Sequence, residues 1–451
     1  MIAAPSALPA AIAAQPSSWT GSYALPATAA AVAITLRIHG RKVTVSLGPG
    51  HAGATELPLD ARGTHVRFNF PGLPQNLVFD GTRKGMHLTG TVRQGALRGT
   101  FRLRPATAKI VSLLGAYRND AGAELAVLEA EGLAPFLVEF PSGATHGIGA
   151  SLTVGRRLGD RSGNGSIAVD ATGFTWHATH YTRVALRQRE VRVGVDAATL
   201  TLPPGTGRFP AVAMVHGSGA STRSEFDVFT AYLALNGIAV LADDKRGVGQ
   251  SGGTYPGDRA NSATINVLAH DAQTEVRFLA KLPQVDPARV GLFGDSQAGW
   301  IVPLAAAREP AVRWLLLNSG PTATVGETDY WAQLAGESEQ PPSGTRAAML
   351  AQVRQAGPSG FDPLPYLRRL DIPGLWMYGS DDRNVPTEIC LERLGTLKTG
   401  HDFTSVVLPT AHTPLELPTG LLSSLPQSPG FDPRFFPAIE AWLHAKHLAP
   451  G

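Results

Sequence analysis

The spacing of hydrophobic positions changes once along the chain, near residue 190. Before that point, from about residue 19 to residue 104, apolar and polar residues alternate, as in the runs Val32–Ile38 and Val43–Leu47. Alternation of period two is typical of strands that bury one face. We therefore predict a small antiparallel β-barrel or sandwich in residues 19–108.

A second β-rich region is expected at residues 109–188. Its apolar runs are shorter and less regular, and they include Phe136–Phe140 and Gly173–Trp176. The pattern sets no sharp boundary between the two β-rich regions. Residues 1–18 are rich in Ala and Pro, and we expect them to be a disordered leader.

Short, nearly continuous apolar runs alternate with helical patterns beyond residue 190, which is typical of parallel strands covered on both faces. The predicted strands are Ala211–Val215, Ile238–Ala242, Val290–Gly294, Trp314–Leu317, Leu375–Tyr378 and Ser405–Leu408. The predicted helices are Glu225–Leu235, Asn266–Leu282, Thr345–Gln355 and Phe435–Leu448. Residues 189–451 should form one α/β domain with a doubly wound, mostly parallel sheet. The alternation pauses after Gly320, which predicts a cap inserted at about 321–370.

The composition fits a globular protein of two or three domains. Of 451 residues, 43% are hydrophobic and 17% are charged. The net charge is only +3, and Lys and Arg are scattered singly, so we expect no nucleic-acid partner. Cys390 is the only cysteine, which excludes a disulfide framework and a thiolate metal site within one chain. We expect no metal and no cofactor.

The N-terminus lacks the positive segment and the unbroken apolar segment of a signal peptide. It fits a disordered leader or the start of a mature chain after cleavage, which slightly favours a secreted or periplasmic protein over a cytoplasmic one. No run of about 18 uncharged apolar residues predicts a membrane span. The sequence leaves the oligomeric state open.

The strongest local motif is Val290–Trp300, in which a buried strand meets a tight turn and then a helix. Small residues on both sides of Ser296 allow a strained turn that presents its hydroxyl at the end of the sheet, as a nucleophile requires. The motif departs from G-x-S-x-G because Ala298 replaces the second glycine. Alanine is still small enough for close packing of the helix on the strand. A serine that merely caps the helix is the alternative.

A second turn, Met214–Gly219, follows an earlier predicted strand. Its glycines let a backbone N–H point at an oxygen that gains negative charge during acyl transfer. The expected oxyanion-hole donors are the N–H of Gln297 and that of Ser218 or Gly217. We expect His216 to brace this loop rather than to transfer protons.

An acid and a base follow two later strands. Leu408–His412 places a histidine just past the last predicted strand, where it would take the proton of Ser296. A carboxylate must hold that imidazole, and Asp381 and Asp382 both follow the strand before it. We favour Asp382 because it lies three residues past Gly379 and just ahead of Val385-Pro386.

Four further residues are candidates for the substrate pocket. Arg223 would contact an acidic group of the substrate or pair with Glu327 to anchor the cap; a solvated surface pair is an equally good interpretation. Trp300 and Trp331 would line an apolar acyl pocket, unless they are core aromatics.

Taken in chain order, five motifs make residues 190–451 resemble the α/β-hydrolase superfamily, specifically bacterial esterase-like and prolyl-oligopeptidase-like hydrolases. They are His216–Gly219, Asp244–Ser251, the turn at Ser296, Gly379–Pro386 and Pro409–His412. The order Ser, Asp, His is the one this fold uses. The resemblance also implies that Asp244–Ser251 is a structural turn in which Arg246 braces an ion pair. The front half resembles accessory domains only loosely.

The expected function is hydrolysis of a small carboxylic ester or acyl substrate through an acyl-enzyme. Ser296 attacks, His412 transfers the proton and Asp382 orients His412. A peptidase, amidase or acyl-CoA thioesterase with the same residues is the main alternative, although no propeller repeat is visible in the front half. A non-catalytic binding protein on a hydrolase-like fold is the remote one.

Overall fold

The computed structural model describes residues 18–25, 32–39, 41–47, 55–70, 76–105, 113–128, 135–148, 152–156, 163–336, 341–397, 399–412 and 431–449. The predicted leader, residues 1–18, lies outside the described residues except for Ser18. The chain divides into two compact units, and each is described by itself. The first is Met1–Ser112 with Glu131–Ala134, and the second is Leu113–Ala130 with Pro135–Gly451.

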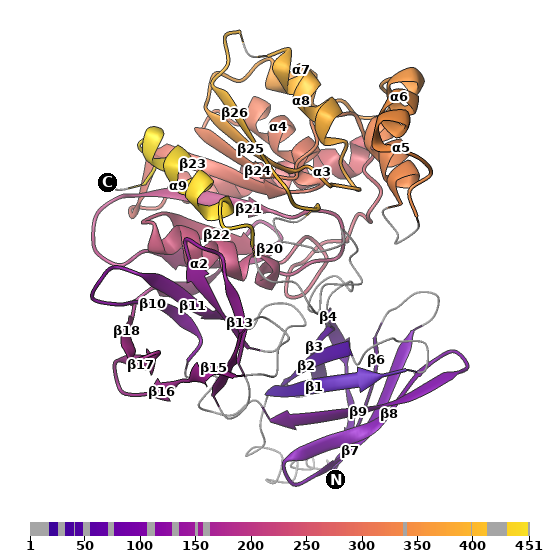
Figure 1. The fold of residues 1–451 in the computed structure, drawn as a ribbon, viewed down its shortest axis with the longest axis vertical. Helices are drawn as coiled ribbons and strands as arrows, with labels where there is room; N and C mark the ends of the chain where they lie inside the picture. Colours follow the sequence, from indigo (N-terminus) through magenta and orange to yellow (C-terminus); the bar gives the residue numbers. More distant parts are fainter. Residues whose placement is uncertain are drawn as a thin grey trace, which may run out of the picture. The chain divides into compact units, whose positions relative to one another are not determined.

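The first unit is an antiparallel β-structure, so the β-rich N-terminal region is confirmed (Figure 1). Within its described residues one nine-stranded sheet has the order β4-β3-β2-β1-β9-β8-β7-β6-β5. The strands are β1 (Ser18–Ala24), β2 (Val32–His39), β3 (Lys42–Leu47), β4 (Thr55–Pro58), β5 (Asp60–Arg62), β6 (His65–Phe70), β7 (Leu77–Lys84), β8 (His87–Gln94) and β9 (Leu97–Pro105). Its two ends, β4 and β5, are separated in the chain by Leu59 alone, so the sheet curls toward itself.

Alternate residues of these strands form the core of the first unit. Phe79 is fully buried, and its ring lies 4.8 Å from that of Phe68 and 5.6 Å from that of Phe101. The period-two pattern of the sequence thus corresponds to one buried face per strand.

The second unit contains the remaining β-rich region as well as the α/β sheet. Its strands are β10 (Gly115–Arg118), β11 (Glu124–Leu128), β12 (Phe136–Phe140), β13 (Thr145–Gly147), β14 (Thr153–Gly155), β15 (Gly163–Ser166), β16 (Ala168–Val169), β17 (Gly173–Trp176) and β18 (Thr179–Arg183). The ring of Phe140 lies 5.3 Å from Tyr232 and 5.1 Å from Phe436, which belong to two helices of the α/β part. Aromatic packing therefore joins this region to the α/β sheet.

The α/β sheet has the order β19-β20-β22-β21-β23-β24-β25-β26. Strand β20 pairs antiparallel with β19 and β22, and the other neighbouring pairs are parallel. The strands are β19 (Arg187–Val193), β20 (Asp196–Leu202), β21 (Phe209–Val215), β22 (Ala239–Asp243), β23 (Val285–Asp295), β24 (Trp314–Asn318), β25 (Gly374–Gly379) and β26 (Phe403–Leu408). Because β21, β23, β24, β25 and β26 run in one direction, their carboxyl ends share one edge of the sheet (Figure 1).

Helices cover both faces of this sheet (Figure 1). On strand β23, Leu292 packs in the core with Ile265 and Ile301, which come from α3 (Ser262–Ala280) and α4 (Ala298–Arg308). The next residue, Phe293, faces the other way, and its ring lies 4.9 Å from that of Phe229. Phe229 belongs to α2 (Asp227–Leu235), beside which lies α9 (Phe435–Ala445). Because the strands are buried on both faces, their apolar pattern is nearly continuous.

Three helices lie between β24 and β25, in the segment predicted as a cap. They are α5 (Val325–Ala335), α6 (Arg346–Ala356) and α7 (Leu364–Leu367). The first begins with a capping box, because the Thr324 hydroxyl accepts the N–H of Glu327 and the Glu327 carboxylate accepts that of Thr324. No helix in the described residues is long and apolar enough to cross a membrane.

Helix α3 begins earlier than the apolar pattern predicted. The expected start was Asn266, whereas the helix begins at Ser262. The side chain of Asn261 accepts the N–H groups of Ala263 and Thr264 at 2.9 and 3.0 Å and so sets the first turn.

Candidate active site

Ser296 lies in a strained turn between β23 and α4. Its φ is +50°, a region that L-residues other than glycine rarely adopt. The Ser296 N–H donates to the carbonyl of Asn318 on the neighbouring strand at 2.9 Å, which helps to hold this conformation. The turn places the Ser296 side chain past the carboxyl end of β23.

Two glycines allow α4 to pack closely behind the turn. A Cβ at Gly299 would lie 2.3 Å from the nitrogen of Pro321, and one at Gly294 would lie 2.7 Å from the Cβ of Ala298. Ala298 therefore fits where the usual motif has glycine, because Gly294 leaves room for its methyl group.

His412 and Asp382 complete a hydrogen-bonded chain with Ser296. The Nε2 of His412 lies 2.9 Å from the Oγ of Ser296. Its Nδ1 lies 2.9 Å from Oδ2 and 3.1 Å from Oδ1 of Asp382. Hence the structure brings together the three residues predicted from separate motifs, each past the end of a different parallel strand. This is the arrangement in which a histidine can remove the proton of a serine hydroxyl.

The carboxylate of Asp382 is fully buried and held by the backbone. Its Oδ1 accepts the N–H groups of Asn384 and Val385, both at 2.8 Å, so Oδ2 is turned toward His412. Asp381 is exposed, and its N–H donates to the carbonyl of Thr410 at 3.0 Å. The geometry therefore favours Asp382 over Asp381 as the partner of His412.

The loop after β21 lies against the serine turn. A Cβ at Gly217 would lie 3.1 Å from the Cβ of Ser296, so the backbone of Gly217 passes close to the serine. The ammonium of Lys245 donates to the carbonyls of Gly217 and Gly219 at 2.7 and 3.1 Å. Because C=O and N–H point in opposite directions in a trans peptide, this contact turns the N–H of Ser218 away from Lys245.

Lys245 is a site residue that the sequence reasoning missed. Only 2% of its surface is exposed, and burial lowers its pKa to about 8. The available signal was a charged residue two positions past a buried strand, inside the Asp244–Ser251 motif. Arg246 forms the expected ion pair, with its Nε 2.7 Å from Asp271.

His216 braces the loop, as its position suggested. Its Nδ1 lies 2.9 Å from the Glu225 carboxylate, and its Nε2 lies 2.8 Å from the carbonyl of Asp243. Burial alone would lower the pKa of His216, but the Asp243 and Glu225 carboxylates outweigh it and raise the pKa to about 10. The imidazole is therefore a cation at neutral pH.

Arg223 and Glu327 do not pair with each other, so that expectation was wrong. The guanidinium of Arg223 binds Asp244, with Nε 2.9 Å from Oδ1, and also reaches Glu190. Glu327 caps α5, and its carboxylate lies 3.6 Å from Arg393. Both charges are engaged inside the fold.

Trp300 and Trp331 are core residues rather than pocket walls, which corrects the other pocket expectation. They are 5% and 0% exposed. The Nε1 of Trp300 donates to Ala323 at 2.8 Å, and that of Trp331 donates to the carbonyl of Asp382 at 3.2 Å. Trp331 therefore supports the loop that holds the acid.

Asp295, which precedes the serine, carries a perturbed carboxyl group. Asn318 donates to its Oδ1 at 2.7 Å, and burial raises its pKa to about 7. The unfolded value is about 4, so the folded state binds the proton more tightly and loses stability as the pH rises from about 4 to 7.

We expect Asp295→Asn to remove this loss. Relative to the parent protein, the variant should gain about 2 kcal/mol in free energy of unfolding between pH 5 and pH 8. Urea unfolding at both pH values measures the difference, with the exposed Asp371→Asn as a control. Equal differences at the two pH values would contradict the assignment.

A family model described as serine aminopeptidase, S33, matches residues 208–338. The match includes β21, the serine turn and the whole of α5. Over this segment the chain is similar to α/β-hydrolases.

Curated relatives of this chain include an esterase and several thioesterases. It is 26% identical to the esterase EstD of Thermotoga maritima over 45% of this chain and 53% of that protein. It is 25% identical to acyl-coenzyme A thioesterase 5 of Mus musculus over 47% of this chain and 49% of that protein. The chain thus spans about half the length of the curated relatives it matches. Among solved structures, it is similar to the Pyrococcus furiosus esterase Pf2001, with 16% identity and a TM-score of 0.42 over 58% of this chain and 91% of that chain.

Proposed function

We propose that this protein is a serine hydrolase that cleaves carboxylic esters through an acyl-enzyme. The observation that carries the proposal is the continuous chain of hydrogen bonds from Asp382 through His412 to Ser296. His412 takes the hydroxyl proton while Ser296 forms a bond to the acyl carbon, and then gives that proton to the departing alcohol. Water, deprotonated by the same imidazole, releases the acid. No step requires a cofactor.

The proposed oxyanion hole consists of the N–H groups of Gln297 and Ser218. Gln297 directly follows the nucleophile, and Gly217 lies against the Ser296 side chain, which supports this placement. The hydrogen bond from Lys245 to the Gly217 carbonyl supports Ser218 over Gly217 as the second donor, because it turns the Ser218 N–H toward the opposite side. Each such donor is worth about 3 kcal/mol in the transition state.

We also propose that the segment at about 321–370 caps the carboxyl edge of a doubly wound sheet and limits which substrates enter. Helices α5, α6 and α7 lie in the chain between β24 and β25, and β25 leads into the loop that carries Asp382. The β-rich region before residue 189 is proposed as an accessory region. Specificity would then depend on these segments rather than on the three reacting side chains.

A substrate panel tests the proposed reaction class. We expect turnover of p-nitrophenyl esters of short and medium acyl chains, and much slower turnover of the matching anilides. The thioesterases among the relatives make acyl-CoA the second class to include. If the protein hydrolysed acyl-CoA faster than every ester, its function would be that of a thioesterase. Failure to react with a fluorophosphonate would contradict a nucleophilic Ser296.

Lys245→Met should lower kcat about tenfold or more and leave KM nearly unchanged. The apolar side chain fills the buried space but no longer fixes the Gly217 and Gly219 carbonyls, so the oxyanion donor loses its orientation. The rate of fluorophosphonate labelling should fall in parallel, which a purely structural role would not produce.

The exposed Lys281→Met is the matched control and should keep full activity. An unchanged kcat in Lys245→Met, with a normal circular dichroism spectrum, would show that the lysine does not position the loop.

A further inference from the structure

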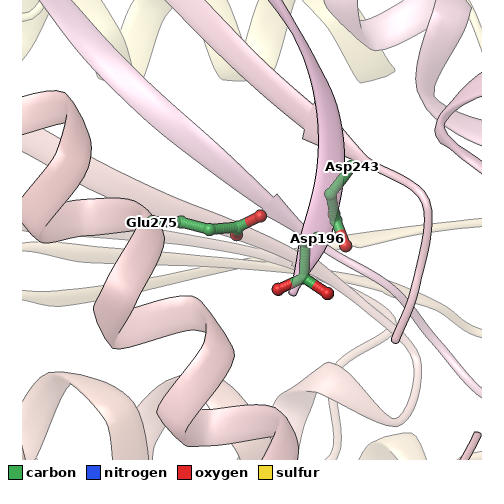
Figure 2. Close-up of side chains that lie close together, drawn as sticks. All are labelled: Asp196, Asp243 and Glu275. Carbon is green, nitrogen blue, oxygen red and sulfur yellow. The ribbon is translucent and has the colours of Figure 1, made fainter. Parts of the chain in front are cut away.

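Three buried carboxylates lie close together outside the triad (Figure 2). Asp196 begins β20, Asp243 ends β22 and Glu275 lies on α3. They are 1%, 7% and 3% exposed, and one oxygen of each lies within 4.8 Å of the others. Three segments that are far apart in the sequence therefore bring like charges into one buried place.

Two of these carboxylates each have one oxygen without a hydrogen-bond partner. Oδ1 of Asp196 and Oε1 of Glu275 are fully buried, and neither has a donor among the described residues. An unpartnered charged oxygen in the interior is strongly unfavourable, so it requires either a proton or a cation. Figure 2 shows the Glu275 side chain extending from its helix toward the two aspartates.

Each neighbouring cation is already engaged, and among the described residues none is paired with Asp196 or Glu275. His216 faces Asp243, with Nε2 3.4 Å from Oδ1, and its other nitrogen binds Glu225. The guanidinium of Arg246 is paired with Asp271 through two nitrogens.

The ammonium of Lys245 points at the loop carbonyls of Gly217 and Gly219. Within the described part of this unit, Asp196 and Glu275 consequently form no ion pair of their own. Two uncompensated negative charges match one divalent cation.

A cavity of about 30 Å³ adjoins the cluster. Asp243, Glu275 and Asp271 contribute to its wall, and none of Ser296, Asp382 and His412 does. Room for a single water requires about 10–15 Å³, so this space can hold waters that complete the coordination of a small ion.

We propose that Asp196, Asp243 and Glu275 bind one hard divalent cation, Ca²⁺, Mg²⁺ or Mn²⁺. Carboxylate oxygens with additional water are the ligands these ions prefer. The ion would tie β20, β22 and α3 together behind the loop that carries His216, and so stabilise the fold without entering the reaction. In the absence of an ion, burial and the neighbouring carboxylates raise the pKa of Asp196 to about 8 and that of Glu275 well above its usual range.

Metal content and thermal unfolding of the full chain test the proposal. Protein purified without chelator should contain about one Ca²⁺, Mg²⁺ or Mn²⁺ per chain by elemental analysis. After dialysis against EDTA, adding one of these ions at about 100 times its Kd should raise Tm by about 5 °C, and NaCl at matched ionic strength should not. Separate titrations with CaCl2, MgCl2 and MnCl2 identify the preferred ion.

Glu275→Gln and Asp243→Asn should each weaken binding of the preferred ion at least about tenfold, because each variant loses one anionic ligand. In EDTA, Glu275→Gln should be as stable as the parent protein or more so, since a neutral amide replaces a repelled carboxylate. The exposed Asp371→Asn should behave as the parent protein. Absence of a bound ion together with no ion-specific rise in Tm would overturn the proposal, and so would full affinity in both variants. Metal content and Tm are measured without the ester-hydrolysis assay, so a failure of the metal proposal can be distinguished from a failure of the proposed function.

Discussion

Replacing Ser296 by alanine should lower kcat/KM for a p-nitrophenyl ester by about 10⁴- to 10⁶-fold. The variant keeps the loop, His412 and Asp382, but no oxygen is left to form the acyl-enzyme. Fluorophosphonate labelling should disappear at the same time. Initial rates at several substrate concentrations, with active-site titration of the parent protein, measure the effect.

The exposed Ser262→Ala, at the start of α3, is the matched control and should retain full activity. Ser296→Gly adds a stability readout. Because φ at this position is +50°, glycine should be about 1 kcal/mol more stable than alanine there. A Ser296→Ala protein that still turns over the ester at an undiminished rate would remove the basis of the proposed mechanism.

Asp382→Asn should lower kcat by about 10⁴-fold although the shape of the site is kept. Oδ1 of Asp382 accepts two backbone N–H groups, from Asn384 and Val385. The amide oxygen of asparagine must occupy that position, which leaves its NH2 group facing Nδ1 of His412. The imidazole then carries its proton on Nε2 and cannot accept the one on Ser296.

Asp381→Asn tests the same charge change one residue away. Its side chain is exposed, and its main contact to the β26 loop is through the backbone, so we expect activity within about twofold of the parent protein. The pH profile of kcat for Asp382→Asn should also differ from that of the parent protein, whereas the Asp381→Asn profile should not. Equal losses in both variants would contradict the assignment of Asp382.

The proposed triad could be predicted because its parts follow a local rule. Ser296, Asp382 and His412 each come within four residues of the end of a parallel strand, and the carboxyl ends of such strands meet at one edge. Pattern and spacing therefore indicate the proposed nucleophile, its proposed base and the choice of acid. The chain order of strands and helices in residues 189–451 follows from the same alternation of apolar periods.

The pocket candidates failed because side-chain partners depend on contacts between distant segments. Arg223 meets Asp244 and Glu190 instead of Glu327, and no spacing in the sequence indicates that choice. Trp331 is bulky and apolar in either setting, so its residue type does not distinguish a core position from a pocket wall. The sequence did not predict the cluster of Asp196, Asp243 and Glu275 for the same reason, because its members lie on three separate elements.

The position of His412 also makes the last strand a weak point for catalysis. Among the described residues, strand β26 ends the order of the α/β sheet and pairs with β25 alone, and most of its side chains are at least partly exposed. Peripheral strands open locally at lower free energy than central ones. Opening of β26 would carry His412, the proposed base, away while β21 and β23 keep Ser296 and its loop in place. Heat inactivation should therefore begin below the temperature at which the central sheet unfolds, and reverse on cooling as long as the rest of the sheet stays folded.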